Sequence, residues 1–305
     1  MKRIGSALLY VLLAVSTFAQ EGVKKASENN TLLWKISGKD LKKPSYLFGT
    51  IHVLCADDAV LSDSLKNAIS KCDDVYLEID ISDIFEMIGA LGQMKMRDDT
   101  TLADLLSDED YKKVKNFFEE KSPLLPFSVM ETFKPILAAS TLAESSLDCE
   151  SMTAMEQLIT EEAEKRSKNI KGLETMAYQA GILDSIPYKL QAEELLRYIE
   201  NITDNKGKSE EFDELMDAYK SQDLEKLEKL MLKSDVGVNS YTELLLFKRN
   251  RNWVEKLKKL MPGKSLVVAV GAGHLPGEQG VINLLRKEGF TVSPVSNKLS
   301  KVKTL

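Results

Sequence analysis

The nine residues LVVAVGAGH, from Leu266 to His274, decide the fold of this 305-residue chain. The first five are all apolar, which is typical of a strand that is buried on both faces of a sheet. The last four form a Gly-x-x-His turn, and a helical pattern follows over about 279–288. Residues 290–295 then read as a further strand. This order of strand, turn, helix and strand predicts an α/β unit at the end of the chain.

The first part of the chain shows the same alternation. Three strand-like stretches lie at about 32–36, 45–51 and 75–81, and a helical pattern at 61–71 separates the second from the third. Such an order favours a crossover within one sheet. The region between the two ends of the chain is helical, apart from a short strand at 170–173. We therefore expect an α/β (α+β) fold: a central mixed β-sheet flanked by helices, with a large helical insertion between the N- and C-terminal sheet elements.

The N-terminus has the pattern of a secretory signal peptide. Lys2 and Arg3 precede an apolar run from about Ala7 to Val15, and Ala19 ends a small-residue cleavage site. The run is shorter than the roughly 20 residues that a membrane-spanning helix needs, and no cysteine stands near the cut to carry a lipid anchor. We expect a protein in the periplasm or outside the cell, without a transmembrane segment after signal removal. Its expected parts are a signal peptide at 1–19, a flexible leader at 20–30, one domain at 31–297 and a tail at 298–305.

Composition excludes several classes of protein. Hydrophobic residues make up 43% of the chain, which is too large a share for a disordered protein. The formal net charge of −6 gives no general footprint for a nucleic-acid partner. The chain has three cysteines, an odd number that leaves at least one thiol unpaired. Because export permits disulfides, the sequence leaves open both a Cys55–Cys72 bridge and the alternative of buried thiols.

The chain has two histidines, and each closes a Gly-x-x-His turn behind an apolar strand. His52 follows Gly49, and His274 follows Gly271 and Gly273. These glycines permit a sharp turn or a close approach of the backbone. Ligands of open α/β sheets bind outside the carboxyl ends of the strands. Two strands of one sheet can therefore bring both imidazoles into one crevice.

Two glutamates stand in comparable places. Glu78 lies inside the strand expected at 75–81, where an ionised carboxylate needs a partner, a metal or an exposed strand end; a water-facing position on an edge strand is the alternative. Glu174 ends the strand at 170–173, and its alternative role is to cap the helix that follows. Two histidines and a glutamate can hold a divalent transition metal with open positions. A second carboxylate could then act as general base.

The basic run KRNRNW, from Lys248 to Trp253, offers further candidates. Arg251 and Asn252 can point into the crevice, where a guanidinium stabilises a developing oxyanion or binds a substrate carboxylate. A solvated helix face is the alternative reading of this run.

Several short motifs together resemble the TraB/GumN family, which includes the Tiki proteins. They span residues 32–295 in this order: YLFGTIH at 46–52, Leu77-Glu78, Gly172-Leu-Glu-Thr175 with Gln179, Arg251-Asn-Trp253, and Val270-Gly-Ala-Gly-His-Leu275 with Gly277 and Gly280. The resemblance implies a fold related to the erythromycin esterases and the ChaN-like haem-binding proteins. In the Tiki branch, the two Gly-x-x-His motifs and glutamates accompany metal-dependent proteolysis.

The resemblance also implies a role for each candidate residue. It assigns metal binding to His52, His274 and Glu78, and catalysis to Glu78, Glu174, Arg251 and Asn252. The implied cofactor is a divalent transition metal (Mn²⁺, Co²⁺ or Zn²⁺), and the implied substrate is a peptide or a small molecule. We therefore expect an exported metal-dependent hydrolase, a peptidase. Two alternatives stay open: a haem-, metal- or small-ligand-binding protein without turnover, and a metal-independent esterase in which a histidine beside a carboxylate acts as base.

Overall fold

The computed structural model describes residues 30–121, 126–145, 147, 149–204, 210–233 and 241–298. The signal peptide expected at 1–19 lies outside these ranges. So do all but one residue of the leader expected at 20–30 and all but one of the tail at 298–305. Within the described ranges, every helix is too short or too polar to span a lipid bilayer.

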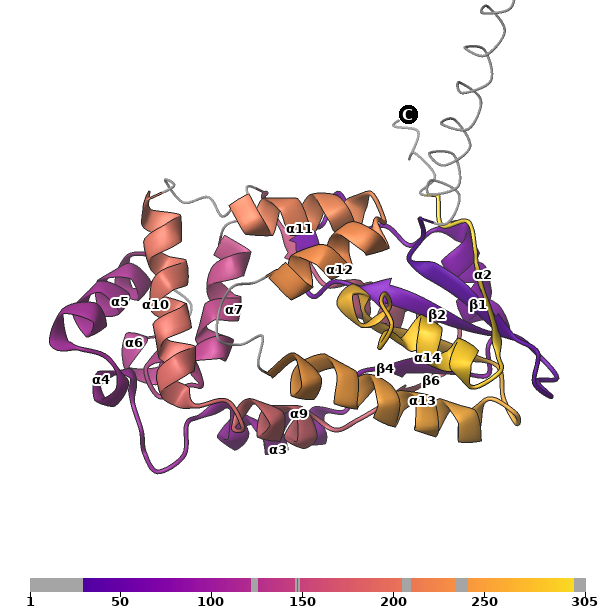
Figure 1. Ribbon diagram of the computed structural model, residues 1–305, viewed down its shortest axis with the longest axis horizontal. Coiled ribbons are helices and arrows are strands. Elements are labelled where there is room, and N and C mark those ends of the chain that lie inside the picture. The colour runs from indigo at the N-terminus through magenta and orange to yellow at the C-terminus, as the bar shows by residue number, and fades with distance from the viewer. Residues whose placement is uncertain are drawn as a thin grey trace, which may run out of the picture.

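A mixed β-sheet lies in the right half of the molecule as seen in Figure 1, with helices around it. Among the described residues, six strands pair in the order β6-β4-β7-β2-β1-β8. Their bounds are β1 Leu33–Ser37, β2 Ser45–Thr50, β4 Asp74–Leu77, β6 Asn169–Gly172, β7 Leu266–Gly271 and β8 Thr291–Pro294. Strands β6, β4, β7 and β2 are parallel, and β1 is antiparallel to both β2 and β8. The mixed α/β sheet expected from the sequence is confirmed.

The apolar stretch LVVAV lies at the middle of the parallel strands. Residues 266–270 are buried throughout, because β4 pairs with one edge of β7 and β2 with the other. Register aligns the strand ends: Thr50 lies beside Gly271, and Leu77 lies beside Gly172. The four parallel strands therefore end at one edge of the sheet, and the residues that follow them gather there.

Helices flank the sheet and continue away from it (Figure 1). The flanking helices are α2 Asp63–Lys71, α3 Ile84–Ala90, α8 Met155–Lys165, α9 Met176–Leu183, α11 Glu210–Lys220, α12 Leu224–Lys233, α13 Lys248–Leu260 and α14 Val281–Lys287. Helix α2 begins where Ser62 caps the amide of Leu65, and it buries Leu65, Ala68 and Ile69, as the helical spacing predicts. Helices α13 and α14 pack against each other, and α12 packs on the turn that ends in His274.

The helical insertion has a hydrophobic core of its own. It consists of α4 Leu102–Leu105, α5 Asp108–Lys121, α6 Phe127–Met130, α7 Pro135–Ser145 and α10 Tyr188–Asp204, which stand together on the left of Figure 1. Its core contains Leu102, Val114, Phe118, Phe127, Met130, Ala138, Leu142, Ala192, Leu195 and Ile199. The insertion expected between the N- and C-terminal sheet elements is thus present.

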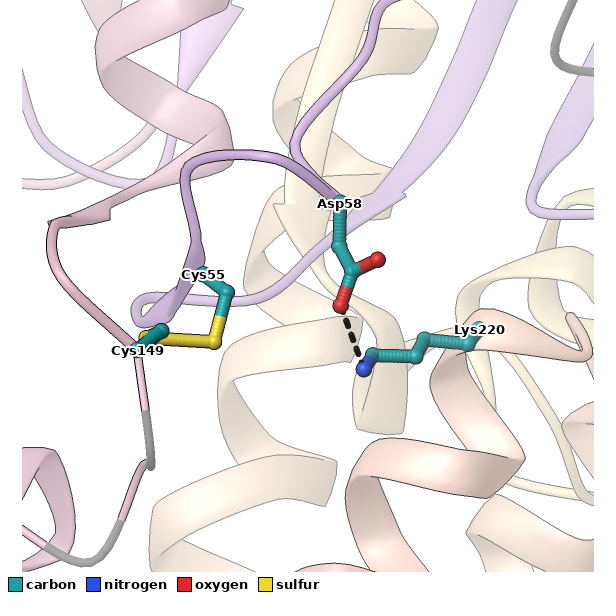
Figure 2. Close-up of a disulfide and its surroundings, with 4 residues drawn as sticks. All are labelled: Cys55, Asp58, Cys149 and Lys220. Atoms are coloured by element: carbon teal, nitrogen blue, oxygen red, sulfur yellow. Dashed lines mark ion pairs between the residues drawn. A yellow bond between two sulfur atoms is a disulfide. The ribbon is translucent and has the colours of Figure 1, made fainter. Parts of the chain in front are cut away.

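A two-stranded sheet joins the end of the first Gly-x-x-His turn to the start of α8. Its strands are β3 Leu54–Cys55 and β5 Met152–Thr153, and a disulfide between Cys55 and Cys149 lies beside it (Figure 2). An ion pair of 2.5 Å between Asp58 and Lys220 ties the same loop to α11. The sequence did not indicate this small sheet.

The structure corrects the cysteine pairing. A Cys55–Cys72 bridge is wrong, because Cys72 ends α2 inside the hydrophobic core, where its Sγ donates to the carbonyl of Ile69. Cys72 is instead a buried thiol, the other alternative for this residue. Burial raises the pKa of the Cys72 thiol to about 11, so this cysteine stays protonated and unreactive at neutral pH.

Removing the disulfide is expected to destabilise the protein measurably. Cys55 and Cys149 are 94 residues apart, and a cross-link over a loop of that length stabilises a fold by roughly 2–4 kcal/mol. Replacing both cysteines with serine should therefore lower the urea midpoint of the oxidised protein. The double variant should be insensitive to dithiothreitol, whereas the wild type should weaken in it. Equal midpoints for variant and oxidised wild type would contradict the role assigned to this bridge.

A buried aspartate ties together the opposite, amino ends of the strands. Asp74, the first residue of β4, is 1% exposed. It accepts hydrogen bonds from Lys264 at 2.6 Å, Asn169 at 3.0 Å and Lys171 at 3.2 Å. Burial raises the pKa of Asp74, but these three donors outweigh it and lower the pKa from 3.8 to about 2. The ionised carboxylate therefore stabilises the folded state.

Asp74→Asn is expected to cost about 2 kcal/mol of folding free energy at pH 7, the value of a pKa difference of this size. Because the folded pKa is the lower one, the contribution is complete above about pH 4 and is lost as the pH falls through 2. Urea unfolding at pH 7, 4 and 2.5 measures the difference. The exposed Asp57→Asn is the matched control, and a loss at pH 7 no larger than that of Asp57→Asn would refute the expectation.

Candidate active site at the carboxyl ends of the strands

Each predicted site residue of the sheet follows a different parallel strand. Glu174 follows β6, Glu78 follows β4, His274 follows β7 and His52 follows β2, in the order of the strands across the sheet. The alignment of the strand ends thus brings residues from four distant parts of the sequence to one edge. The contacts there divide them into a buried group, which contains His274 and the two glutamates, and the more exposed His52.

Glu78 occupies the centre of the buried group. Its Oε1 accepts a 2.8 Å hydrogen bond from the amide of Gly271, and its Oε2 accepts from Arg249 and, at 3.1 Å, from Gln179. Burial by itself raises the pKa of Glu78, but His274, Arg249 and the Gly271 amide lower it to about 2. The carboxylate is therefore ionised and held in place at neutral pH.

Two expectations for Glu78 need correction. The strand expected at 75–81 ends at Leu77, because Glu78 is already the point where the chain bends; its carbonyl accepts the amide of Glu174 at 2.9 Å. The alternative of a water-facing glutamate on an edge strand is also wrong. Strand β4 lies between β6 and β7, and Glu78 is buried.

Glu174 shares Arg249 with Glu78. Its Oε1 accepts hydrogen bonds of 2.8 Å from Nε of Arg249 and from Gln179, and its Oε2 accepts one of 3.0 Å from the indole of Trp253. The alternative role as a helix cap is wrong, since Thr175 caps α9. Arg249 thus bridges two buried carboxylates, and the ion pairs with both are largely shielded from water. Its guanidinium also lies over the Trp253 ring, 4.7 Å from the centroid.

His274 is buried beside this ion-pair network in a single orientation. Its Nδ1 lies 2.6 Å from Oδ1 of Asn250, whose amide nitrogen donates to the carbonyl of Gln279 at 2.9 Å. Nδ1 is therefore the protonated nitrogen, and Nε2 carries the lone pair. Nε2 lies 3.3 Å from Arg249 and 3.7 Å from Oε1 of Glu78. Burial, with a smaller effect of Arg249, lowers the pKa of His274 to about 4, so the ring is neutral at pH 7.

His52 has the same motif but a different environment. Its side chain is 75% exposed, and Nδ1 lies 2.9 Å from Oε1 of Glu156, which is itself buried in the first turn of α8. This contact raises the pKa of His52 to about 9. The sequence analysis missed Glu156. The signal that could have found it is its position in the stripe of α8 that also buries Met155, Ile159 and Ala163.

Arg251 and Asn252 do not point into the buried group. Arg251 pairs with Glu243 at the surface, and the exposed Asn252 donates to the hydroxyl of Tyr178 at 3.2 Å. The basic run does enter the site, but through its neighbours Arg249 and Asn250. The reason is the phase of α13, in which Asn250, Trp253, Val254 and Leu257 form the buried side. A π-helical turn, Glu243–Phe247, directly precedes this helix. Because such a turn departs from the regular α-helical spacing, the sequence before α13 does not indicate which of its residues face the site.

The glycines of the two turns are required for close packing. A Cβ on Gly49 would lie 2.9 Å from Cδ1 of Leu275, and one on Gly271 would lie 3.2 Å from Oε1 of Glu78. A Cβ on Gly273 would lie 1.8 Å from Sδ of Met231, in the helix α12 that covers the turn. None of the three has a positive φ. Of the two reasons expected for these glycines, close approach of the backbone therefore applies.

The part of the chain that the structure describes contains no group of three or more histidine, cysteine, aspartate or glutamate side chains arranged around a common metal position. It does contain two imidazole–carboxylate pairs, His52 with Glu156 and His274 with Glu78. Both oxygens of Glu156 are buried; Oε1 lies 2.9 Å from Nδ1 of His52, and Oε2 makes no hydrogen bond with any described residue. Imidazole nitrogen and free carboxylate oxygen are donors that Mn²⁺, Co²⁺ and Zn²⁺ accept. The free Oε2 of Glu156 beside His52 is therefore the donor set that fits a divalent cation.

Comparison with known proteins agrees with the motifs. The profile of the TraB/PrgY/gumN family matches residues 32–294. The chain is 24% identical over 335 residues to metalloprotease TIKI1 of Homo sapiens, which covers 91% of this chain and 65% of that protein. It is 23% identical over 353 residues to the metalloprotease TIKI homolog of Amphimedon queenslandica, which covers 98% of this chain and 67% of the relative. The chain thus spans less than two thirds of the length of human TIKI1. No solved structure matches it.

Proposed function

Because this chain belongs to the TraB/PrgY/gumN family, we propose that it is an exported hydrolase that depends on a divalent metal and cleaves peptides. Relatives that align with 86–98% of the chain are named metalloproteases, which supports the reaction class. The observation that carries the proposal is the edge of the sheet where both histidines and both glutamates follow neighbouring parallel strands.

The proposed metal ligands are His52, His274 and Glu78, and the proposed metal is Mn²⁺, Co²⁺ or Zn²⁺. When bound, such a cation polarises a substrate carbonyl and lowers the pKa of water enough to make it a nucleophile near neutral pH. Asn250 prepares His274 for this role, because it holds Nδ1 as the donor and leaves the lone pair on Nε2.

The remaining groups of the site position the reacting ones. Arg249 forms ion pairs with Glu78 and Glu174 in a buried place and contributes to the lowered pKa of Glu78. Glu174 has both oxygens bound, to Arg249 and Gln179 on one side and to Trp253 on the other. We therefore propose that Glu174 orients Arg249 rather than acting as the general base.

A second candidate function rests on the 2.9 Å contact between His52 and Glu156. An exposed imidazole beside a buried carboxylate can act as a general base without a metal. This arrangement fits a metal-independent esterase that works at alkaline pH: above the His52 pKa of about 9 the ring is neutral and can take a proton from the attacking nucleophile, and Glu156 stabilises the imidazolium.

The two functions separate in one assay. The mature chain is stripped with a chelator and offered a peptide library and a series of acyl esters, before and after addition of Mn²⁺, Co²⁺ or Zn²⁺. The metallopeptidase should lose peptide cleavage in the chelator and regain it with at least one of the three ions. Ester cleavage that persists in the chelator would identify the esterase, and failure of every ion to restore peptide cleavage would exclude the metallopeptidase.

Export has a separate test. The proposal expects the full-length chain to be recovered outside the cytoplasm with Gln20 as its first residue, because Ala19 ends the cleavage site. Mass spectrometry of the N-terminal peptide measures this. Recovery with Met1 intact would contradict cleavage.

A further inference from the structure

Glu156 is a buried carboxylate that uses only one of its oxygens in a contact with a described side chain. The residue is 8% exposed, its Oε1 lies 2.9 Å from Nδ1 of His52, and its Oε2 has no hydrogen bond from any described residue. The buried hydroxyls of Thr50 and Thr160 are likewise without a hydrogen bond in the described structure. Thr50 comes two residues before His52, and Thr160 lies one helical turn after Glu156. Unsatisfied buried polar groups are rare and costly, so a free carboxylate oxygen at this place points to a bound ion or water.

The fold holds Glu156 against His52 by several independent contacts. The amide of Met155 donates to the carbonyl of Ile51 at 3.1 Å, and β3, just after His52, pairs with β5, just before Met155. The disulfide between Cys55 and Cys149 closes the same pair of segments (Figure 2). The segments that carry His52 and Glu156 are therefore linked close to both residues, although the two residues are about 100 positions apart in the chain.

The contact has the dimensions of two ligands on one ion. With metal–ligand bonds of about 2.0–2.2 Å, two donors in adjacent positions lie roughly 3 Å apart. Nδ1 of His52 lies 2.9 Å from Oε1 of Glu156, and Oε2 of Glu156 has no partner among the described residues. Both Glu78 and Arg249 of the buried group interact electrostatically with His52, so the pair lies next to that group.

We propose that Glu156 binds the divalent cation of this site together with His52, and that the Thr50 and Thr160 hydroxyls hydrogen-bond water in its coordination shell. The inference rests on the proposed metal dependence and adds a ligand that the motifs of the sequence do not indicate. It gives the free Oε2 of the buried carboxylate a partner, and it gives a purpose to the disulfide and the small sheet that lie next to His52.

The test is calorimetric titration of the metal-stripped mature chain with Co²⁺ alone. Glu156→Gln should weaken Co²⁺ binding by at least about 100-fold, since even groups that only support a ligand contribute 10- to 100-fold. Glu164→Gln is the matched control: it makes the same chemical change at an exposed position of the same helix α8, and it should bind Co²⁺ like the wild type. Without metal, Glu156→Gln should still fold cooperatively, because glutamine keeps the shape of the side chain and loses only the charged contact with the exposed His52 ring.

Histidine NMR gives a second readout that does not depend on activity. With only two histidines in the chain, the His52 ring is assigned by one His52→Ala variant. Zn²⁺ should shift the His52 ring resonances of the wild type, and Glu156→Gln should require much more Zn²⁺ for the same shift. Wild-type affinity in Glu156→Gln would overturn the assignment of Glu156 and leave the metal-dependent function standing. A wild type that binds neither Co²⁺ nor Zn²⁺ would overturn both.

Discussion

Replacing Arg249 with methionine is expected to destabilise the folded protein by roughly 3–5 kcal/mol, the usual cost of removing one partner of a buried ion pair. The Arg249 side chain is 11% exposed and bridges Glu78 and Glu174, which are similarly buried. Methionine keeps much of the volume but leaves two ionised carboxylates next to each other without a counter-charge. Urea unfolding at pH 7 measures the loss.

Arg251→Met is the control for this experiment. It makes the same change two residues away, where the side chain is exposed and pairs only with Glu243 at the surface, so it should cost about 0.5 kcal/mol or less. Adding Glu78→Gln and Glu174→Gln to Arg249→Met should recover much of the loss, because the charges that Arg249 compensates are then gone. Equal stability of the two methionine variants would show that Arg249 does not bridge the glutamates.

His52→Ala is expected to abolish hydrolysis while leaving the fold intact. His52 is a proposed metal ligand and, in the esterase alternative, the base, so either function should lose about 10³-fold or more in kcat/KM, roughly 4 kcal/mol of transition-state stabilisation. The ring is mostly exposed, so its removal opens no cavity, and the melting temperature should fall only through the lost contact with Glu156. Peptide and ester cleavage, with thermal melting of the same samples, measure both effects.

His274→Ala is the comparison that makes the result specific. His274 packs against Trp253, with 4.5 Å between ring centroids, and binds Asn250. Its loss should lower activity and stability together, because it opens a cavity and leaves the Asn250 oxygen unpaired. If His52→Ala retains full activity, then neither proposed function uses the exposed histidine.

The edge of the sheet where the site lies could be predicted from local sequence. Each of the four segments reads as a strand by itself, and parallel strands point their carboxyl ends toward the same edge of a sheet. His52, Glu78, Glu174 and His274 therefore fall at one edge without any knowledge of side-chain packing. The same reasoning could not distinguish Arg249 from Arg251. These residues lie on different sides of α13, and the packing of the helix decides which side faces the site.

By itself, the sequence indicated the mixed sheet, the helical insertion and the candidates His52, Glu78, Glu174 and His274, because the periodicity of apolar residues and the turns that end a strand are local properties; it placed Glu78 inside a strand, which the structure ends at Leu77. Only the tertiary structure decided the partners: Cys149 for Cys55, Glu156 for His52, and Arg249 between Glu78 and Glu174. It also separated two identical Gly-x-x-His motifs into a buried neutral imidazole under α12 and an exposed one with a carboxylate behind it. The partner of each residue depends on which distant segment packs against it. The pKa of a side chain in turn depends on its burial, on the charges near it and on its hydrogen bonds, and all of these come from such neighbouring segments.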